Sequence, residues 1–173
     1  MADTSPSVLR KLMRALDTHL ETLVIRKNQD GPRPDYPYCA YGVLVRKKDA
    51  ANLRYPKPNE DPTKISMGHF IPEEVKVSLS FYNANAENPL DVLYELSTKA
   101  REWLEIHGKD AIEKIGVVID DFSTLQDRTT LLDVVYEYQL GFDFRIRGFR
   151  EAELVLDAVD LESTFNSIDW ENE

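Results

Sequence analysis

The chain has 173 residues and a mass of 19.9 kDa, which is enough for one domain with a single hydrophobic core. Hydrophobic residues make up 42% and charged residues 30% of it, and these globular values exclude wholesale disorder. No run approaches the ~18 apolar residues of a membrane span and no apolar signal core stands near the N-terminus, so we expect no membrane partner. The single cysteine, Cys39, excludes an internal disulfide and a cysteine-based zinc cluster.

Charge is unevenly distributed along the chain. The 21 basic and 31 acidic residues give a formal net charge of −10. Up to Lys48 there are 9 basic and 5 acidic residues, or +4, whereas the remainder has 12 basic and 26 acidic residues, or −14. The stretch Glu151–Glu173 holds eight acidic residues and no basic one. A chain this acidic does not hold phosphates by charge, so we expect a soluble protein that does not stick to DNA rather than a groove-reading nucleic-acid binder.

Two amphipathic helices are predicted. The first begins with Ser5 as N-cap and Pro6 at its first position, and its apolar stripe is Val8, Leu9, Leu12, Met13, Leu16, Leu20 and Leu23. The second begins at Asn88 and Pro89 and ends at Gly108, with the stripe Leu93, Leu96, Ala100, Trp103 and Leu104. Because each helix is apolar on one side only, both must pack on another layer.

Alternating patterns predict the strands of that layer. Strand 38–47 places Cys39, Tyr41, Val43 and Val45 on one face, and strand 65–70 pairs with strand 75–82 across a turn at Ile71-Pro72-Glu73. Further strands are expected at 115–119 and 159–165. Loops are predicted at 28–37, 48–64 and 120–131. The expected fold is α+β, a mixed and mostly antiparallel sheet of about five to six strands packed against two main α-helices.

The strongest pattern runs from Val134 to Arg147. Its even positions are all apolar or aromatic, whereas the odd positions are mostly polar: Val135, Glu137, Gln139, Gly141, Asp143, Arg145 and Arg147. At ~3.4 Å per residue this strand spans roughly 45 Å, which is longer than usual. A strand of this length can outrun its own sheet, and we expect the excess to pair with another subunit.

Candidate chemistry is sparse. His19, His69 and His107 lack metal-ligand spacing, and Cys39 has no basic neighbour, so a packed thiol is expected there. The pair Asp120 and Asp121 follows a strand, where carboxylates hold Mg²⁺ or act as a base, although an acidic pair that starts a turn is commoner. Asp127, Arg128 and Asp133 fit a structural salt-bridge group or an intersubunit contact equally well. No cofactor is expected.

The order of these pieces resembles a known family. After the first helix come Asn28, Pro32-Arg33-Pro34 and Pro37-Tyr38-Cys39-Ala40-Tyr41, then Val77–Tyr82 and the second helix. Leu131-Leu132-Asp133 and Phe142-Asp143-Phe144-Arg145 complete the series. Over roughly Leu9 to Phe165 the chain is similar to the neck or tail terminator family of tailed bacteriophages. We treat 1–173 as one such domain, with a loop insertion at about 49–64 and an acidic tail from about 166 that both fall outside the pattern.

The resemblance implies a structural protein without catalytic residues. Such subunits form a ring, expected to be hexameric, on the head-proximal end of the tail tube, where the ring ends tube polymerisation and offers the head-joining surface. The implied location is the virion neck, reached from the host cytoplasm. The implied partners are further copies, the tube protein, the head-completion protein and, in a contractile tail, the sheath, while DNA passes through an acidic channel without specific binding. As a homo-oligomer interface or channel lining we expect Arg33, Glu137, Gln139, Asp143, Arg145 and Arg147.

Two other classes of function stay open. A soluble assembly adaptor or chaperone would be absent from the finished particle. A small metal-dependent hydrolase would use Asp120 and Asp121. We also expect the 49–64 insertion to be a contact loop that becomes ordered on assembly.

Overall fold

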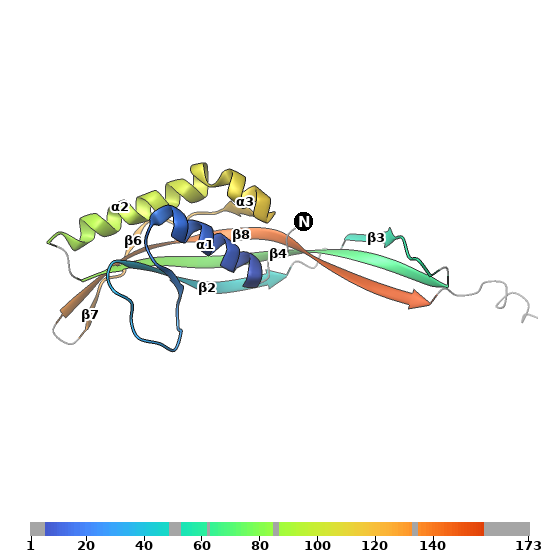
Figure 1. Cartoon of the computed structure of the whole chain (residues 1–173), viewed down its shortest axis with the longest axis horizontal. Helices are drawn as coiled ribbons and strands as arrows, with labels where there is room; N and C mark the ends of the chain where they lie inside the picture. The colour runs from blue at the N-terminus through green and yellow to red at the C-terminus, as the bar shows by residue number, and fades with distance from the viewer. Residues whose placement is uncertain (1–5, 49–52, 62, 85–86, 133–134, 158–173) are drawn as a thin grey trace, which may run out of the picture.

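The computed structural model describes residues 6–48, 53–61, 63–84, 87–132 and 135–157. Within these ranges the protein has one eight-stranded sheet with three α-helices and one π-helical turn. The helices all lie on one side of the sheet and cover only part of its length, as Figure 1 shows. The α+β class and the mixed, mostly antiparallel sheet are therefore as predicted from the sequence, with a few more strands.

The sheet has the order β1-β2-β4-β8-β5. The strands in this order are β1 (Val24–Arg26), β2 (Tyr38–Lys48), β4 (Lys64–Asn83), β8 (Val135–Asp157) and β5 (Val118–Asp120). β1 pairs in parallel with β2, and the other pairings are antiparallel. Three short strands pair off this path: β3 (Leu53–Lys57) with β4, and β6 (Gln126–Asp127) and β7 (Thr130–Leu132) with β8.

The first helix matches its predicted pattern. α1 (Pro6–Leu20) buries every predicted apolar position up to Leu20, because one face of a helix repeats every 3.6 residues. Leu23 is a correction, since it lies beyond the helix and its side chain is 51% exposed. Ser5, the predicted N-cap, lies outside the described residues.

The second helical region is longer than predicted. α2 (Pro89–Glu102) continues through the π-helical turn η1 (Trp103–His107) and past Gly108 into α3 (Lys109–Ile115). Gly108 is therefore not the end: it is a packing position, where a Cβ would lie 2.7 Å from the Trp103 ring. The helical region ends at Gly116. Its φ of 82° is left-handed, a conformation that glycine adopts without strain.

β4 and β8 form one continuous ribbon. Twenty register pairs join them, from Lys64–Asp157 to Asn83–Tyr138, over a length of roughly 65 Å. The predicted turn at residues 71–73 is wrong, because Pro72 continues the strand. It lies where β2 pairing has ended at Glu73 and β3 pairing begins at Phe70, so a missing N–H on that edge costs no ladder bond.

Other strand predictions also need correction. β8 extends ten residues past Arg147, and the strand predicted at 159–165 lies outside the described residues. Ile115 belongs to α3, so the strand predicted at 115–119 begins only at Val118. A bulge between Val43 and Val45 moves Val45 off the face of Cys39 and Tyr41. The predicted loop at 48–64 contains β3, and the one at 120–131 contains β6 and most of β7.

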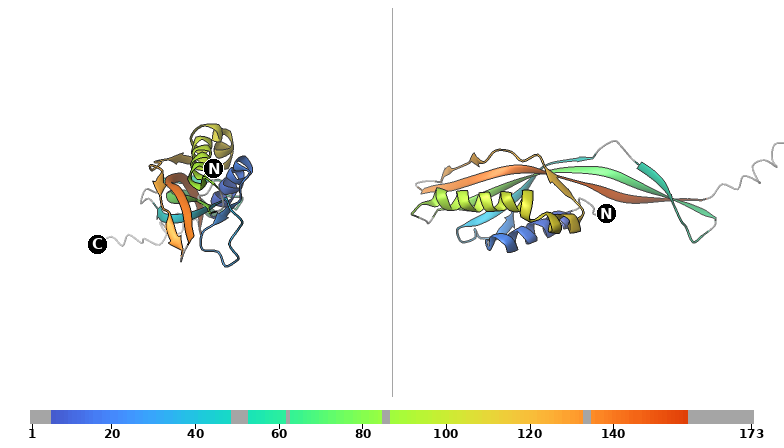
Figure 2. Two further views of the ribbon diagram at one scale, coloured as in Figure 1. Left: turned by 90° about the vertical axis from the view of Figure 1, so that its left-hand side faces the viewer. Right: turned by 90° about the horizontal axis from the view of Figure 1, so that it is seen from above.

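The hydrophobic core lies between the helices and one half of the ribbon. Cys39 is fully buried there as a packed thiol, and burial raises its pKa. The ribbon contributes Val75, Val77, Leu79, Phe81, Leu140, Phe142, Phe144 and Ile146. Beyond this half the strands continue without helices above them. We call β3 together with residues 64–73 and 148–157 the arm, which projects from the helix-covered part in Figures 1 and 2.

Gly141 offers a test of how closely the ribbon packs. A Cβ at this position would lie 2.4 Å from the Leu79 carbonyl oxygen, whereas nothing stands within 4 Å of one at Gly31. We expect Gly141→Ala to lower the free energy of unfolding by about 1–3 kcal/mol, the usual cost of overpacking. Gly31→Ala should change it by less than about 0.5 kcal/mol. Urea unfolding followed by circular dichroism measures both, and equal stability of the two variants would contradict the packing.

Candidate functional site

The side of the ribbon that faces away from the helices carries the predicted polar residues. We call this side the polar face; from β8 it includes Glu137, Gln139, Asp143, Arg145 and Arg147. Two other segments of the chain contact it: residues 27–37, and residues 121–132, which include β6 and β7. The face is therefore a set of charged clusters rather than a bare surface.

The central cluster is built around Arg128. Its Nη1 donates to the Ser78 Oγ at 2.7 Å and to the Ser80 Oγ at 3.3 Å. Its Nη2 donates to the Asp143 Oδ1 at 2.9 Å. Lys27 Nζ donates to the same Ser80 Oγ at 2.8 Å. Both serines are buried, so the loop and the two long strands share one polar network.

Gly141 has no side chain, and this leaves room for the network. A Cβ there would lie 3.0 Å from the Arg128 Nη1 and 3.1 Å from the Ser80 Oγ. Arg128, which the sequence places near Asp127 and Asp133, has Asp143 as its ionic partner. Asp127 instead accepts the Thr129 backbone N–H at 2.9 Å, and Asp133 lies outside the described residues.

Electrostatics follow from this geometry. Partial burial by itself would raise the pKa of Asp143, but hydrogen bonds from Arg128 and Ser78 and the charge of Arg128 lower it below its ordinary value. Burial, followed by the charge of Arg128, lowers the pKa of Lys27. The Asp143 carboxylate therefore stabilises the fold in its ionised form.

A second cluster joins the polar face to β5. Arg145 Nε donates to the Asp120 Oδ1 at 2.7 Å, and Arg145 Nη1 lies 3.5 Å from the Glu74 Oε2. Arg147 pairs with the other oxygen of Asp120. Burial would raise the pKa of Asp120, but Arg145 and Arg147 lower it. Both Asp120 oxygens thus contact guanidinium groups, whereas Asp121 is exposed and lies 4.0 Å from Arg145.

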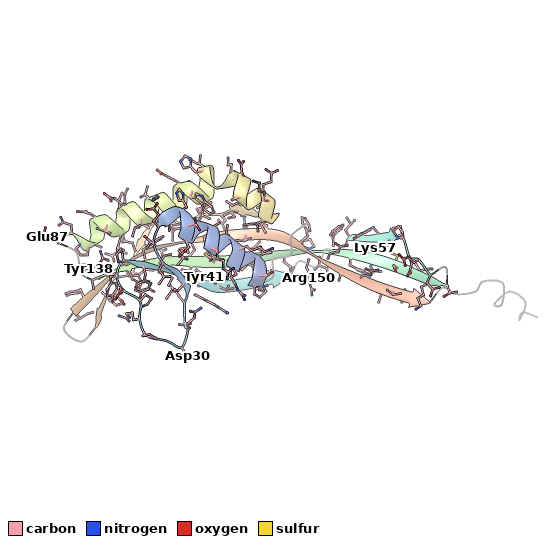
Figure 3. The ribbon with its side chains drawn as sticks, in the orientation of Figure 1. Asp30, Tyr41, Lys57, Glu87, Tyr138 and Arg150 are labelled. Atoms are coloured by element: carbon pink, nitrogen blue, oxygen red, sulfur yellow. The ribbon has the colours of Figure 1, made fainter. Side chains whose placement is uncertain are left out.

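The third cluster holds the Pro-Arg-Pro loop. Arg33 Nη1 lies 2.8 Å from the Glu137 Oε1, and the Tyr36 hydroxyl donates to the same oxygen at 2.7 Å. Glu137 is buried. Burial and the nearby charge of Glu137 raise the pKa of Tyr38 to about 12. In Figure 3 the tip of this loop, near Asp30, projects below the sheet.

The structure thus brings five of the six predicted site residues into three ion-paired clusters. Sequence reasoning missed their partners Lys27, Tyr36, Ser78 and Ser80. The alternation of β4 already indicated that both serines lie on the polar face, but their contacts to Arg128 cross 48 to 50 residues of sequence. Whether any of the six touches a second subunit stays a prediction.

The arm has a different character. It exposes apolar side chains on both sides: Leu53, Ile65, Phe149, Leu154, Val155 and Leu156. Its β8 edge is also open, because β5, β6 and β7 cover β8 only up to Arg147, and within the described residues no strand pairs with that edge from Gly148 to Asp157. An open edge and an apolar surface are the usual features of a sheet that adds a partner.

β3 is fixed to the arm by specific contacts. The Tyr55 ring covers Gly68, where a Cβ would meet it at 2.3 Å, and stacks on Phe70 with a centroid distance of 4.9 Å. Lys57 Nζ lies 2.9 Å from the Glu153 Oε2. At the base, Arg150 Nε lies 3.2 Å from the buried Glu73 Oε1. Figure 3 shows Arg150 at the base of the arm and Lys57 further out along it.

Two negative findings concern the part of the chain that the structure describes. No three of its His, Cys, Asp and Glu residues are grouped so that they could hold a metal ion. None of its helices combines the length and apolar character needed to cross a membrane.

His19, one of the three histidines considered in the sequence, packs within the fold: its ring stacks on Trp103 at a centroid distance of 5.8 Å.

Compared with known protein families, the chain matches the one described as phage neck terminator protein over residues 9–171. It belongs to this family. A search of curated proteins found no match. Membership indicates a structural rather than an enzymatic role, at the neck of a phage particle and in contact with other head or tail proteins.

The Arg128 cluster of this neck terminator subunit gives a pH prediction. Because the pKa of Asp143 is lowered on folding, its stabilising effect is complete above the ordinary aspartate value of about 3.9 and is lost as the pH falls through the lowered value. We expect Asp143→Asn to lower the free energy of unfolding by about 1–3 kcal/mol at pH 7. The difference from the natural chain should shrink steadily below pH ~4.

The matched control is Asp110→Asn on α3. Asp110 is exposed and, among the described residues, forms no ion pair. Its substitution should change stability by less than about 0.5 kcal/mol. Urea titrations at several pH values measure both variants. A difference for Asp143→Asn that does not depend on pH would contradict the charge-based account.

Proposed function

We propose that the protein is the terminator ring of a phage tail. Six copies assemble on the head-proximal end of the tail tube and end its polymerisation. Their opposite side receives the head-completion protein, and the sheath also contacts the ring in a contractile tail. DNA leaves through the central channel. Family membership supports the structural role at the neck, and the arm supports the ring.

The single observation that carries the ring is the arm. It projects from the helix-covered half with an open strand edge and exposed apolar side chains. A contact between the arm of one copy and a different surface of the next is heterologous, and such contacts generate closed rings when the rotation closes. Addition of a strand to an open edge supplies backbone hydrogen bonds, while the apolar side chains supply burial.

The polar face supplies the second part of the proposal. Of the six candidates, Arg33 and Arg147 have the most exposed side chains, at 51% and 55%. We propose that these two arginines reach the neighbouring subunit, and that their ion-pair partners, Glu137 for Arg33 and Asp120 for Arg147, help to position them. The in-chain ion pairs favour this arrangement because they hold the guanidinium groups in place before assembly.

Charge supports a channel for DNA. The subunit as a whole is acidic, with a net charge of −10, and we propose that acidic side chains line the channel, where they repel phosphates instead of retaining them. DNA therefore passes without specific binding. An assembly adaptor would share this charge but would not remain in the finished particle.

The location can be tested with a nonsense codon in this gene of the encoding phage. We expect lysates with unjoined heads and with tails whose tubes vary in length, because nothing stops polymerisation. Electron microscopy measures both, and mass spectrometry of purified natural particles should detect the subunit. Normal tails joined to heads would contradict the proposal. Natural particles that lack the protein would also contradict it and would favour the adaptor.

The arm can be tested by complementation of the same mutant. We expect Leu154→Glu with Leu156→Glu to abolish joined particles, since burial of the apolar arm becomes unfavourable. The two positions are exposed, so the variant should keep the circular dichroism spectrum and unfolding midpoint of the natural chain. Tyr94→Glu with Ile106→Glu, on the exposed surface of α2 and η1, is the matched control. Full particle yield from the arm variant would contradict the role of the arm.

A further inference from the structure

A groove lies between α1 and the β1–β2 edge of the sheet. Its volume is about 480 Å³. Buried Leu9, Met13 and Tyr41 contribute to its lining, and Leu23 and Val43 stand exposed at its margin. Figure 3 shows Tyr41 in this region, beside α1. The groove is thus apolar below and accessible from outside.

Four arginines from three elements line this groove. Arg10 and Arg14 come from α1, Arg26 from β1 and Arg46 from β2, and all four are exposed. We call it the arginine groove. Among the described residues Arg10, Arg14 and Arg26 form no ion pair. The one acidic side chain in the lining, Asp17, already accepts the Val24 backbone N–H at 2.7 Å.

The positive charge of Arg10, Arg14 and Arg26, which form no ion pair among the described residues, favours an acidic ligand with apolar side chains. Arginines in a groove bind carboxylates by charge-assisted hydrogen bonds, and the apolar floor adds burial. This chain holds a segment of that chemistry. Residues 158–173, here called the terminal segment, contain five acidic residues and no basic one. Between them stand Leu161, Phe165, Ile168 and Trp170.

We propose that the arginine groove of one subunit receives the terminal segment of a second copy. The proposal rests on the ring only in naming a second copy as the occupant. It accounts for the charge asymmetry, since the positive beginning and the negative end of two copies then neutralise each other. It also directs the contact from one subunit to a different surface of the next, as a ring requires.

Geometry favours a second copy over the same chain. The terminal segment starts after Asp157, at the far end of the arm, whereas α1 lies over the other half of the ribbon (Figure 1). To return, the segment would first run back along the arm, roughly 33 Å for ten residues. That path uses about ten of its sixteen residues at full extension, so Leu161 and Phe165 would lie beside the arm and not in the groove.

A labelled peptide tests the proposal without any ring. The peptide is residues 158–173 with an N-terminal fluorophore, and its fluorescence anisotropy is followed while the full-length protein is added. We expect saturable binding that weakens in 1 M salt, where the screening length falls to about 3 Å. A peptide of the same composition in scrambled order should bind at least about tenfold more weakly, a difference of roughly 1.4 kcal/mol.

Charge reversal identifies the site. Arg10→Glu with Arg14→Glu should weaken peptide binding by at least about tenfold, because attraction becomes repulsion. Lys109→Glu with Lys114→Glu reverses the same amount of charge at two exposed positions on α3 and should leave the affinity unchanged. Absence of binding, or equal loss in both variants, would overturn the proposal.

A third full-length protein separates the two possible sources of the segment. It carries Phe165→Ala and Trp170→Ala in its own terminal segment. If a second copy is the occupant, the peptide should bind this protein and the natural chain with equal affinity in dilute solution. Binding at least about tenfold tighter to the variant would show that each chain fills its own groove and would overturn the proposal. Because the assay needs no particle, its failure and the failure of the neck location are independent results.

Discussion

The pairing of β4 with β8 is the constraint on which the other features depend. In the helix-covered half, register is fixed because Val77 and Phe144, or Leu79 and Phe142, must face the helices together. A slip by one residue would turn Asp143 and Arg145 toward the core. Since the strands are continuous, the arm inherits this register. The core therefore determines which side chains lie opposite each other far from any helix.

An isolated two-stranded ribbon is marginally stable in water, so the arm needs support of its own. β3 supplies it as a third strand, fixed by the Tyr55 ring over Gly68 and by stacking on Phe70. The Arg150–Glu73 pair holds the base where the helices end. Two sources of order thus maintain one ribbon: hydrophobic burial in one half, and a short strand with aromatic and ionic contacts in the other.

Much of the fold was predictable because periodicity reports which face is buried. The α1 stripe and the alternation of residues 140–146 were sufficient to place the core. Predictions from local sequence were wrong where tertiary contacts determine the structure. Pro72 indicated a turn but lies in a continuous strand. The bulge at residues 43–45 cannot be recognised from an alternating pattern. The partners of Arg128 were unpredictable for another reason, since local sequence does not show which loop folds back across the ribbon.

In the proposed ring, the arm has to pair with a second subunit without pairing with other sheets. A long, flat and apolar edge would be an aggregation site, and proteins prevent this with charges placed on the exposed edge. Glu151 and Glu153 lie on β8, the strand with the open edge. The Tyr55 hydroxyl donates to Glu151, and Lys57 forms an ion pair with Glu153; both partners lie on β3. A partner that lacks complementary groups would remove these carboxylates from water at a cost in free energy. In the proposed ring, these charges thus favour a partner surface with complementary charge and shape.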